Sequence, residues 1–306
     1  MNWYLALLIG FTCIAASSGW STAADAPTLP PPTKANIAYG THERHVLDLW
    51  QADGESPRPL CIFIHGGGWH GGDKADAPPT LVAAMLKAGI STASINYRFT
   101  RMAKAPAPLY DAARAVQHLR KHAVELNLDP QHFAGYGISA GGVSTLWLVC
   151  HDDLADAKSD DPVLLESSRL QTGVALSPPV CLELPRAMEW VGPQLAGHLM
   201  MARAVGAASS NEVLKRYAEF EPVLRECSPL THVSRDDGPT LISFPRVDPL
   251  PAETPGSAIH HAKFGEKFQE AAQAVGMPCV LRIEDRAGAE LPTTEEFLVR
   301  ELTKAE

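Results

Sequence analysis

Short runs of consecutive apolar residues alternate with stretches of helical spacing along most of the chain. Such runs are typical of strands that are covered on both faces of a sheet. We predict strands at 60–64, 91–97, 132–138, 171–176, 240–244 and 279–283, helices at 81–87, 109–126, 143–150, 264–275 and 295–302, and a hairpin at 36–39 and 45–50. This alternation predicts the α/β class, with a mostly parallel central sheet and helices on both of its faces.

One long segment interrupts the alternation. Residues 180–237 separate two predicted strands and contain helical patches at 194–204 and 211–220. Loops of this length are uncommon in compact domains unless they serve a function. We interpret the segment as a small cap over the active-site face of a single domain that covers residues 36–306.

The first 35 residues have a different pattern. Residues 3–16 are apolar and uncharged, and the small residues Thr22, Ala23 and Ala24 follow before Asp25. The apolar stretch is shorter than the roughly 20 residues that span a bilayer, so we predict a signal peptide at 1–24 with cleavage near Ala24. Residues 25–35 are proline-rich and predict an extended leader. We therefore expect a secreted or periplasmic protein without stable membrane insertion.

Composition narrows the possible functions. The chain has 306 residues, 45% of them hydrophobic and 20% charged, and a formal net charge of -9. This is ordinary globular composition, and no dense run of Lys or Arg predicts a nucleic-acid partner. The sequence contains neither a CxxC nor an HExxH spacing, so it gives no indication of a metal site. Cys181 and Cys227 could form a disulfide, a question that spacing alone leaves open.

The strongest motif for chemistry is Gly137-Ile138-Ser139-Ala140-Gly141, between a predicted strand and a predicted helix. Glycines on both sides permit a tight turn that exposes the serine, which is a nucleophile only when a base removes its proton. We predict that Ser139 occupies the nucleophile position.

A second motif, His65-Gly66-Gly67-Gly68-Trp69, follows the first buried strand. Successive glycines let backbone N–H groups point at one spot, where they can stabilise an oxyanion. We predict Gly67, Gly68 and Ala140 as the donors. We expect His65 to brace the loop and Asp73 to hold it by hydrogen bonds.

These two motifs, together with Gly71-Gly72-Asp73-Lys74 and Asn96-Tyr97-Arg98, resemble the α/β-hydrolase esterases of the hormone-sensitive-lipase and feruloyl-esterase-like (BD-FAE) groups. The resemblance implies an α/β-hydrolase fold, a carboxylic-ester hydrolase with a Ser-Asp-His triad, an oxyanion hole from the glycine loop and no cofactor. It also implies a small-molecule or carbohydrate-linked ester as substrate, because exported members often remove acyl groups from polysaccharides.

The resemblance implies that the triad acid is Asp248, which follows the strand after the cap. The alternative is a loop aspartate that caps a turn beside Pro249. The base is harder to assign, because Ala289 stands where similar enzymes carry the histidine. His260 and His261 are our candidates for the base, and His232 is a weaker one. Without any base, the chain would be a catalytically impaired homologue that acts as a binding or structural module.

Overall fold

The computed structural model describes residues 28–288 and 290–304. The predicted signal peptide, the start of the leader and Ala289 lie outside the described residues. None of the described helices is long and apolar enough to cross a membrane.

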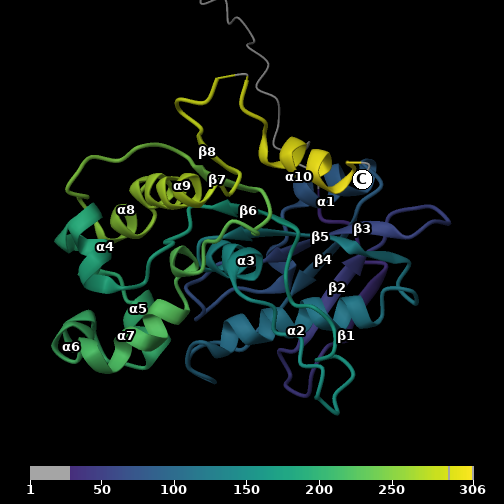
Figure 1. Cartoon of the computed structure of the whole chain (residues 1–306), viewed down its shortest axis with the longest axis horizontal. Coiled ribbons are helices and arrows are strands. Elements are labelled where there is room, and N and C mark those ends of the chain that lie inside the picture. The colour runs from purple at the N-terminus through teal and green to yellow at the C-terminus, as the bar shows by residue number, and fades with distance from the viewer. Residues whose placement is uncertain (1–27, 289, 305–306) are drawn as a thin grey trace, which may run out of the picture.

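One eight-stranded sheet forms the centre of the described structure (Figure 1). The strand order is β1-β2-β4-β3-β5-β6-β7-β8, with β2 antiparallel to both β1 and β4 and every other neighbouring pair parallel. The strands are β1 (Lys34–Ala38), β2 (Val46–Trp50), β3 (Arg58–Ile64), β4 (Ser91–Ile95), β5 (Leu128–Ile138), β6 (Thr172–Leu176), β7 (Thr240–Phe244) and β8 (Cys279–Ile283). The hairpin and all six predicted strands are confirmed, as is the mostly parallel sheet.

Alternate side chains of the central strands belong to two separate cores. In β3, Leu60, Ile62 and Ile64 belong to the larger core, whereas Cys61 and Phe63 belong to the smaller one. Successive side chains of a strand point to opposite faces of the sheet. This is why β3 is apolar without interruption.

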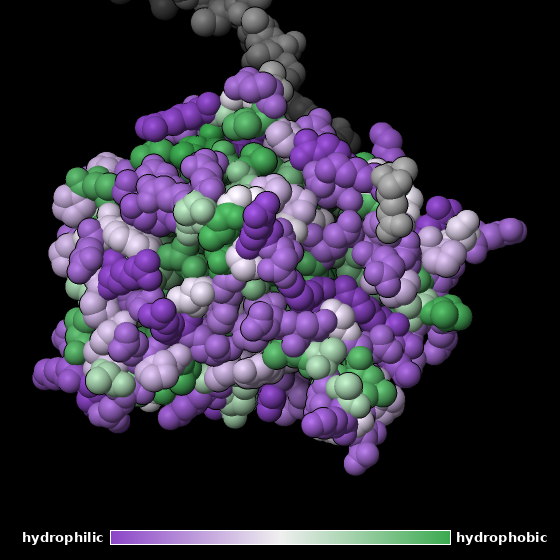
Figure 2. Space-filling view, in the orientation of Figure 1, coloured by the Kyte–Doolittle hydropathy of each residue, from purple (hydrophilic) through white to green (hydrophobic). Residues whose placement is uncertain are grey.

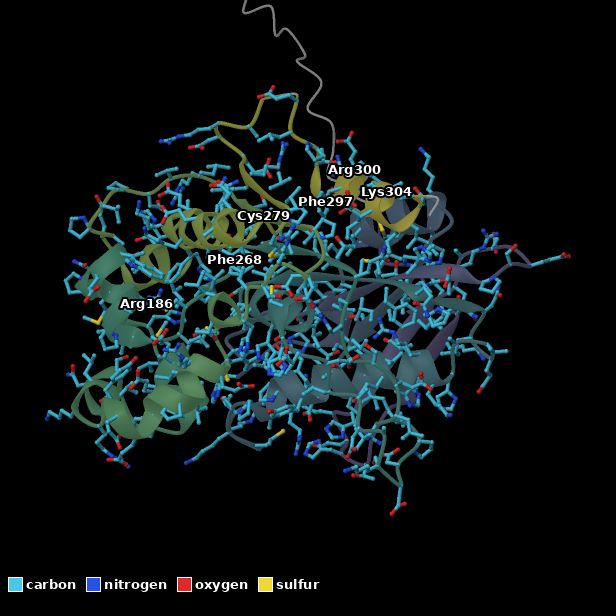
Figure 3. The ribbon with its side chains drawn as sticks, viewed as in Figure 1. Arg186, Phe268, Cys279, Phe297, Arg300 and Lys304 are labelled. Carbon is cyan, nitrogen blue, oxygen red and sulfur yellow. The ribbon has the colours of Figure 1, made fainter. Side chains whose placement is uncertain are left out.

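Helices cover both faces. α2 (Ala107–Lys121), α3 (Ala140–Cys150) and α9 (Lys263–Val275) contribute to the larger core, and α1 (Pro79–Lys87) and α10 (Thr294–Leu302) to the smaller one. Phe268 on α9 and Phe297 on α10, which are labelled in Figure 3, are both fully buried, one in each core. The face of the molecule shown in Figure 2 is mainly hydrophilic, with apolar patches between the hydrophilic residues.

The segment between β6 and β7 forms a group of short helices at one end of the sheet (Figure 1). They are α4 (Leu184–Val191), η2 (Pro193–Gly197), α5 (Met200–Val205), α6 (Ser210–Lys215), α7 (Tyr217–Glu226) and η3 (Pro229–Thr231). Each of the two predicted helical patches in this cap is divided, because 194–204 breaks at His198 and Leu199 and 211–220 breaks at Arg216. A further short helix, α8 (Pro255–Ile259), lies between β7 and α9 and was not predicted.

Candidate active site

Ser139 occupies a sharp turn between β5 and α3. Its φ of 54° and ψ of -118° are rare for a residue with a side chain. The Ser139 N–H donates to the carbonyl oxygen of Leu176 at 2.7 Å, which ties the turn to the end of β6. A Cβ atom on Gly137 would collide with the carbonyl of Gly141, so the first glycine of the motif is required by space.

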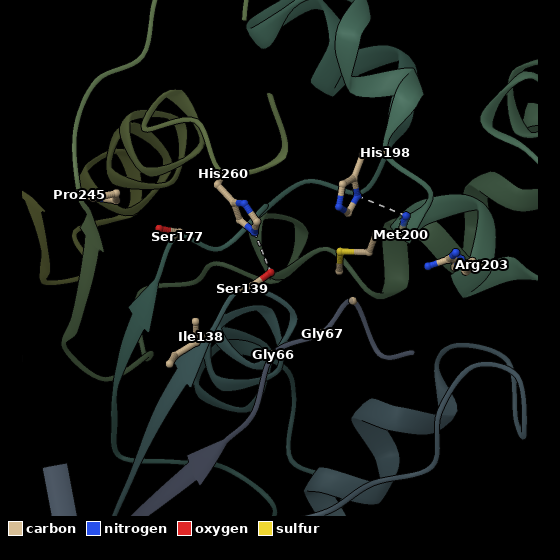
Figure 4. A pocket seen from close by; sticks show the side chains of 11 residues that line it. Gly66, Gly67, Ile138, Ser139, Ser177, His198, Met200, Arg203, Pro245 and His260 are labelled. Atoms are coloured by element: carbon tan, nitrogen blue, oxygen red, sulfur yellow. Dashed lines mark hydrogen bonds between the residues drawn. The ribbon is translucent and has the colours of Figure 1, made fainter. Parts of the chain in front are cut away.

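His260 reaches Ser139 from another part of the chain. It is the C-cap residue directly after α8, and its Nε2 lies 2.9 Å from Oγ of Ser139 (Figure 4). The helix is fixed at its start, where Thr254 accepts a hydrogen bond from the N–H of Ser257 and Pro255 is the first helical residue. The structure therefore places an imidazole within hydrogen-bond distance of the predicted nucleophile.

The environment of His260 favours its neutral form. Burial lowers the pKa of His260 from its usual 6.5, and a hydrogen bond to the carbonyl of Gly256 opposes this only in part. A neutral imidazole can accept a proton from a serine hydroxyl, whereas an imidazolium cannot.

His261 and Asp248 lie together but away from this pair. Nε2 of the buried His261 lies 2.9 Å from the backbone carbonyl oxygen of Asp248, and its Nδ1 accepts a hydrogen bond from Lys263 N–H. The carboxylate of Asp248 pairs with Arg246 at 2.9 Å. Among residues 28–288 and 290–304, no hydrogen bond or ion pair joins that carboxylate to His260. The geometry thus brings Ser139 and His260 together without the predicted acid.

The glycine loop faces the same space as Ser139. Gly67, Gly68 and Trp69 have φ values of 89°, 61° and 56°, so the loop turns through three successive left-handed residues. The N–H groups of Gly67 and Gly68 donate to no protein group in the described part of the chain. Ala140 is the first residue of α3, where a helix has no internal acceptor for its N–H. The three predicted donors are therefore free to bind an oxyanion.

His65 braces the loop from behind. Its ring stacks on Tyr97 with centroids 4.2 Å apart, its Nδ1 lies 2.9 Å from the carbonyl oxygen of Gly66, and its Nε2 accepts from Arg44 at 3.3 Å. The hydroxyl of Tyr97 donates to the carbonyl of His65 at 2.8 Å. Burial lowers the pKa of His65 to about 4. The neutral ring is already fully engaged, as the sequence-based expectation of a bracing role requires.

Asp73 links the loop to the end of β4. Its carboxylate accepts hydrogen bonds from Asn96 Nδ2 at 2.9 Å and from Ala75 N–H at 3.1 Å, and it lies 3.6 Å from Arg44. Trp69 is fully buried, and its indole donates to Ser144 of α3. Both residues hold the glycine loop against the sheet and helix that carry Ser139.

A cavity of about 520 Å³ opens at Ser139, and its lining includes residues that the sequence did not reveal. Ser177 follows β6 in a left-handed conformation, and His198, Met200 and Arg203 come from the cap (Figure 4). Ser177 could have been predicted, because it follows a strand at the edge where α/β sheets bind ligands. The cap residues carry no such signal.

Three side chains that could bind a metal lie close together at the other end of α3. His151, Glu226 and His232 place one ligand atom each within 4.8 Å of one another. Protein groups already occupy them, since His151 Nε2 lies 3.1 Å from Glu226 and His232 Nε2 lies 2.8 Å from the carbonyl of Glu226. These contacts join the cap to α3, and they place His232 at the opposite end of the helix from Ser139.

The cysteines contribute no cross-link among the described residues. Cys181 and Cys227 are both buried and free, as are Cys61 and Cys150, and Cys279 is free and half-buried. The pairing that spacing left open is therefore not formed in the structure.

Comparison with known proteins agrees with this architecture. A family model described as BD-FAE matches residues 47–260, which is more than half of the chain. The chain belongs to the BD-FAE family. The matched range begins in β2 and ends at His260, so it contains the sharp turn at Ser139 (the elbow, residues 137–141), the glycine loop, the cap and α8.

Relatives of this BD-FAE chain are named as esterases. The probable carboxylic ester hydrolase LipM of Mycobacterium tuberculosis is 28% identical over 223 residues, which cover 70% of this chain and 48% of LipM. Esterase LipC of the same organism is 23% identical over 211 residues, with 68% and 49% covered. The chain thus spans about half the length of these relatives.

Solved structures confirm the α/β-hydrolase fold. A truncated carbohydrate esterase from gut microbiota superposes with a TM-score of 0.70 at 21% identity, covering 89% of this chain and 96% of that one. The acetyl ester-xyloside bifunctional hydrolase of Caldicellulosiruptor lactoaceticus gives a TM-score of 0.60 at 25% identity, with 86% and 83% covered.

The elbow yields a stability prediction for Gly141→Ala. A Cβ atom at this position would collide with the carbonyl of Ile64 and lie 2.6 Å from that of His65, and backbone cannot move aside cheaply. We expect a loss of at least about 2 kcal/mol in the free energy of unfolding, measured by urea denaturation. The control is Gly71→Ala, whose Cβ meets nothing within 4 Å. Equal stability of the two variants would contradict the close packing.

His65 yields a prediction for the pH dependence of stability. Its pKa of about 4 in the folded state lies below the usual 6.5, so unfolding takes up a proton between these values and stability falls as the pH falls. From pH 7 to pH 5 we expect a loss of about 2 kcal/mol that is missing in His65→Asn. Urea denaturation of both proteins at the two pH values tests this. The same pH-dependent loss in both would show that His65 does not stay neutral in the folded protein.

Proposed function

We propose that this BD-FAE protein is a carboxylic ester hydrolase in which Ser139 is the nucleophile and His260 is the base. The observation that carries the proposal is the 2.9 Å distance between Ser139 Oγ and His260 Nε2, at a strained turn that faces the glycine loop. The esterase names of the relatives support the same reaction class.

The arrangement supports an acyl-enzyme mechanism. Oγ of Ser139 attacks the ester carbonyl carbon while its proton passes to Nε2 of His260. The N–H groups of Gly67, Gly68 and Ala140 hold the resulting oxyanion. As the C–O bond of the ester breaks, His260 returns the proton to the departing alcohol. A water molecule then attacks the acyl-enzyme, with His260 as base, and the acid is released as Ser139 regains its proton.

We further propose an exported enzyme that acts on carbohydrate-linked esters. The apolar segment at 3–16 and the small residues before Asp25 support export. The structural relative named as an acetyl ester-xyloside bifunctional hydrolase supports a sugar-linked substrate. Release of acetate from acetylated xylan or its oligosaccharides tests the substrate, and detection of a shortened chain outside the cytoplasm tests export.

The alternative of a catalytically impaired homologue no longer has the observation that supported it, which was the lack of a candidate base. It rested on Ala289 in place of the expected histidine. Residue 289 is outside the described structure, but the imidazole of His260 lies within hydrogen-bond distance of Ser139. A base is therefore available without a histidine at 289.

The two adjacent histidines allow a matched test of the base. We expect Ser139→Ala and His260→Asn to lower kcat/KM for 4-nitrophenyl acetate by about 10³-fold or more, because loss of either member of a catalytic pair removes most of the acceleration. His261→Asn, one residue further on, and Asp248→Asn should lower it less than about tenfold.

We expect the rate of labelling by a fluorophosphonate to change in the same way, with a large loss in Ser139→Ala and His260→Asn and a small one in the other two variants. Thermal denaturation of each variant provides the control for folding. An inactive His261→Asn beside an active His260→Asn, both folded, would assign the base to the other histidine. Absence of both hydrolysis and labelling in the folded wild-type protein would overturn the proposed function.

The pH profile offers a separate test. The base must be neutral to act, so kcat/KM should rise with pH as His260 loses its proton. Because burial lowers the pKa of His260, we expect the midpoint of this rise below 6.5. The rate of fluorophosphonate labelling should have the same midpoint. A midpoint above 6.5 would contradict the assignment of the buried His260 as the base.

A further inference from the structure

The cavity at Ser139 differs in charge from the rest of the molecule. The chain carries 35 Asp and Glu against 26 Lys and Arg. Among the eleven described residues that line the cavity, however, the ionisable side chains are Arg203, His198 and His260, and none is a carboxylate. An acidic protein thus has a cavity whose only full charge near neutral pH is positive.

Arg203 has no protein partner in the described part of the chain. It is exposed on α5, and its guanidinium takes part in none of the hydrogen bonds or ion pairs there. By contrast, Arg216 in the same cap is paired with Glu212 and Glu219. An unpaired guanidinium at the wall of a binding cavity is available to a ligand.

His198 lies on the same side of the cavity. Its Nδ1 accepts a hydrogen bond from the N–H of Met200 at 3.3 Å, so its neutral ring carries the proton on Nε2 as a second donor. Its ring centroid is 6.4 Å from that of His260. In Figure 4 the side chains of His260, His198 and Arg203 follow one another across the cavity.

The surrounding charges agree with this arrangement. Burial lowers the pKa of His198, and repulsion from Arg203 and from the protonated form of His260 lowers it further. Burial and the charges of Arg203 and Arg101 likewise lower the pKa of His70. No carboxylate is among the causes of either shift, which agrees with the absence of carboxylates from the described lining of the cavity.

We propose that the ester cleaved at Ser139 carries a carboxylate group that binds to Arg203 and His198. One guanidinium and one imidazole N–H match the single charge and the two oxygens of a carboxylate. This inference rests on the proposed esterase function, since it names the chemical class of substrate for the same site.

Two matched pairs of chromogenic esters test the proposal. On the acyl side, 4-nitrophenyl hydrogen adipate is compared with 4-nitrophenyl hexanoate. On the alcohol side, 3-carboxy-4-nitrophenyl acetate is compared with 4-nitrophenyl acetate. Each kcat/KM is divided by the rate constant of hydrolysis by hydroxide, which removes differences in intrinsic reactivity.

In at least one pair we expect a higher normalised kcat/KM for the anionic ester than for the neutral one. This ratio should fall about tenfold in Arg203→Gln, and it should also fall as salt is added. The pair that responds identifies the side of the ester that carries the carboxylate. Arg216→Gln is the control, because it removes the same charge from the cap but not from the cavity, and the preference should survive in it.

Two other outcomes distinguish failure of this inference from failure of the proposed function. If the wild-type protein hydrolyses the neutral esters but the ratios are the same in Arg203→Gln, the inference is wrong while the esterase function stands. If folded wild-type protein hydrolyses none of the four esters, the proposed function fails and this inference fails with it.

Discussion

The site depends on the direct contact of three backbone segments beneath Ser139. A Cβ atom on Gly141 would collide with the carbonyl of Ile64 at the end of β3, and one on Gly66 would lie 2.8 Å from the carbonyl of Ile138 at the end of β5. Since β3 and β5 are paired neighbours, with Ile64 opposite Gly137, this contact sets the glycine loop beside the start of α3. Oγ of Ser139 and the unpaired N–H groups of the glycine loop then face one cavity.

The strands, the turn at Ser139 and the glycine loop could be predicted from the sequence, because each has a pattern within a short stretch of residues. Continuous apolar runs such as Leu60–Ile64 follow from burial on both faces of a parallel sheet. The elbow and the glycine loop were also readable, because backbone turns with left-handed residues and close contacts require glycine at fixed places. Both patterns are visible within a few consecutive residues, although the contacts that require Gly66 and Gly141 are tertiary.

The base and the cap depend on longer-range geometry. His260 and His261 are adjacent and of one residue type, and only the end of α8 turns the first toward Ser139 and the second toward the carbonyl of Asp248. That helix has five residues, including Pro255 and Gly256, and has too few apolar positions for a periodic pattern. The pattern at 194–204 likewise predicts one helix, whereas the structure has a break between η2 and α5, and His198, which lines the cavity, lies in that break.

The position of Asp248 bears on two unusual features of the site, which are the lowered pKa of His260 and the uncancelled positive charge of Arg203. In a Ser-His-Asp arrangement the carboxylate stabilises the imidazolium and also adds a negative charge beside the cavity. Here Arg246 neutralises Asp248, and the partner that raises the pKa of His260 is the uncharged carbonyl of Gly256. A neutral acceptor stabilises the imidazolium less than a carboxylate does. It also leaves the positive charge of Arg203 uncancelled at the cavity wall. The absence of a carboxylate beside the proposed base, among the described residues, therefore leaves the lowering of its pKa by burial only partly opposed, and it keeps the described lining of the cavity free of negative charge.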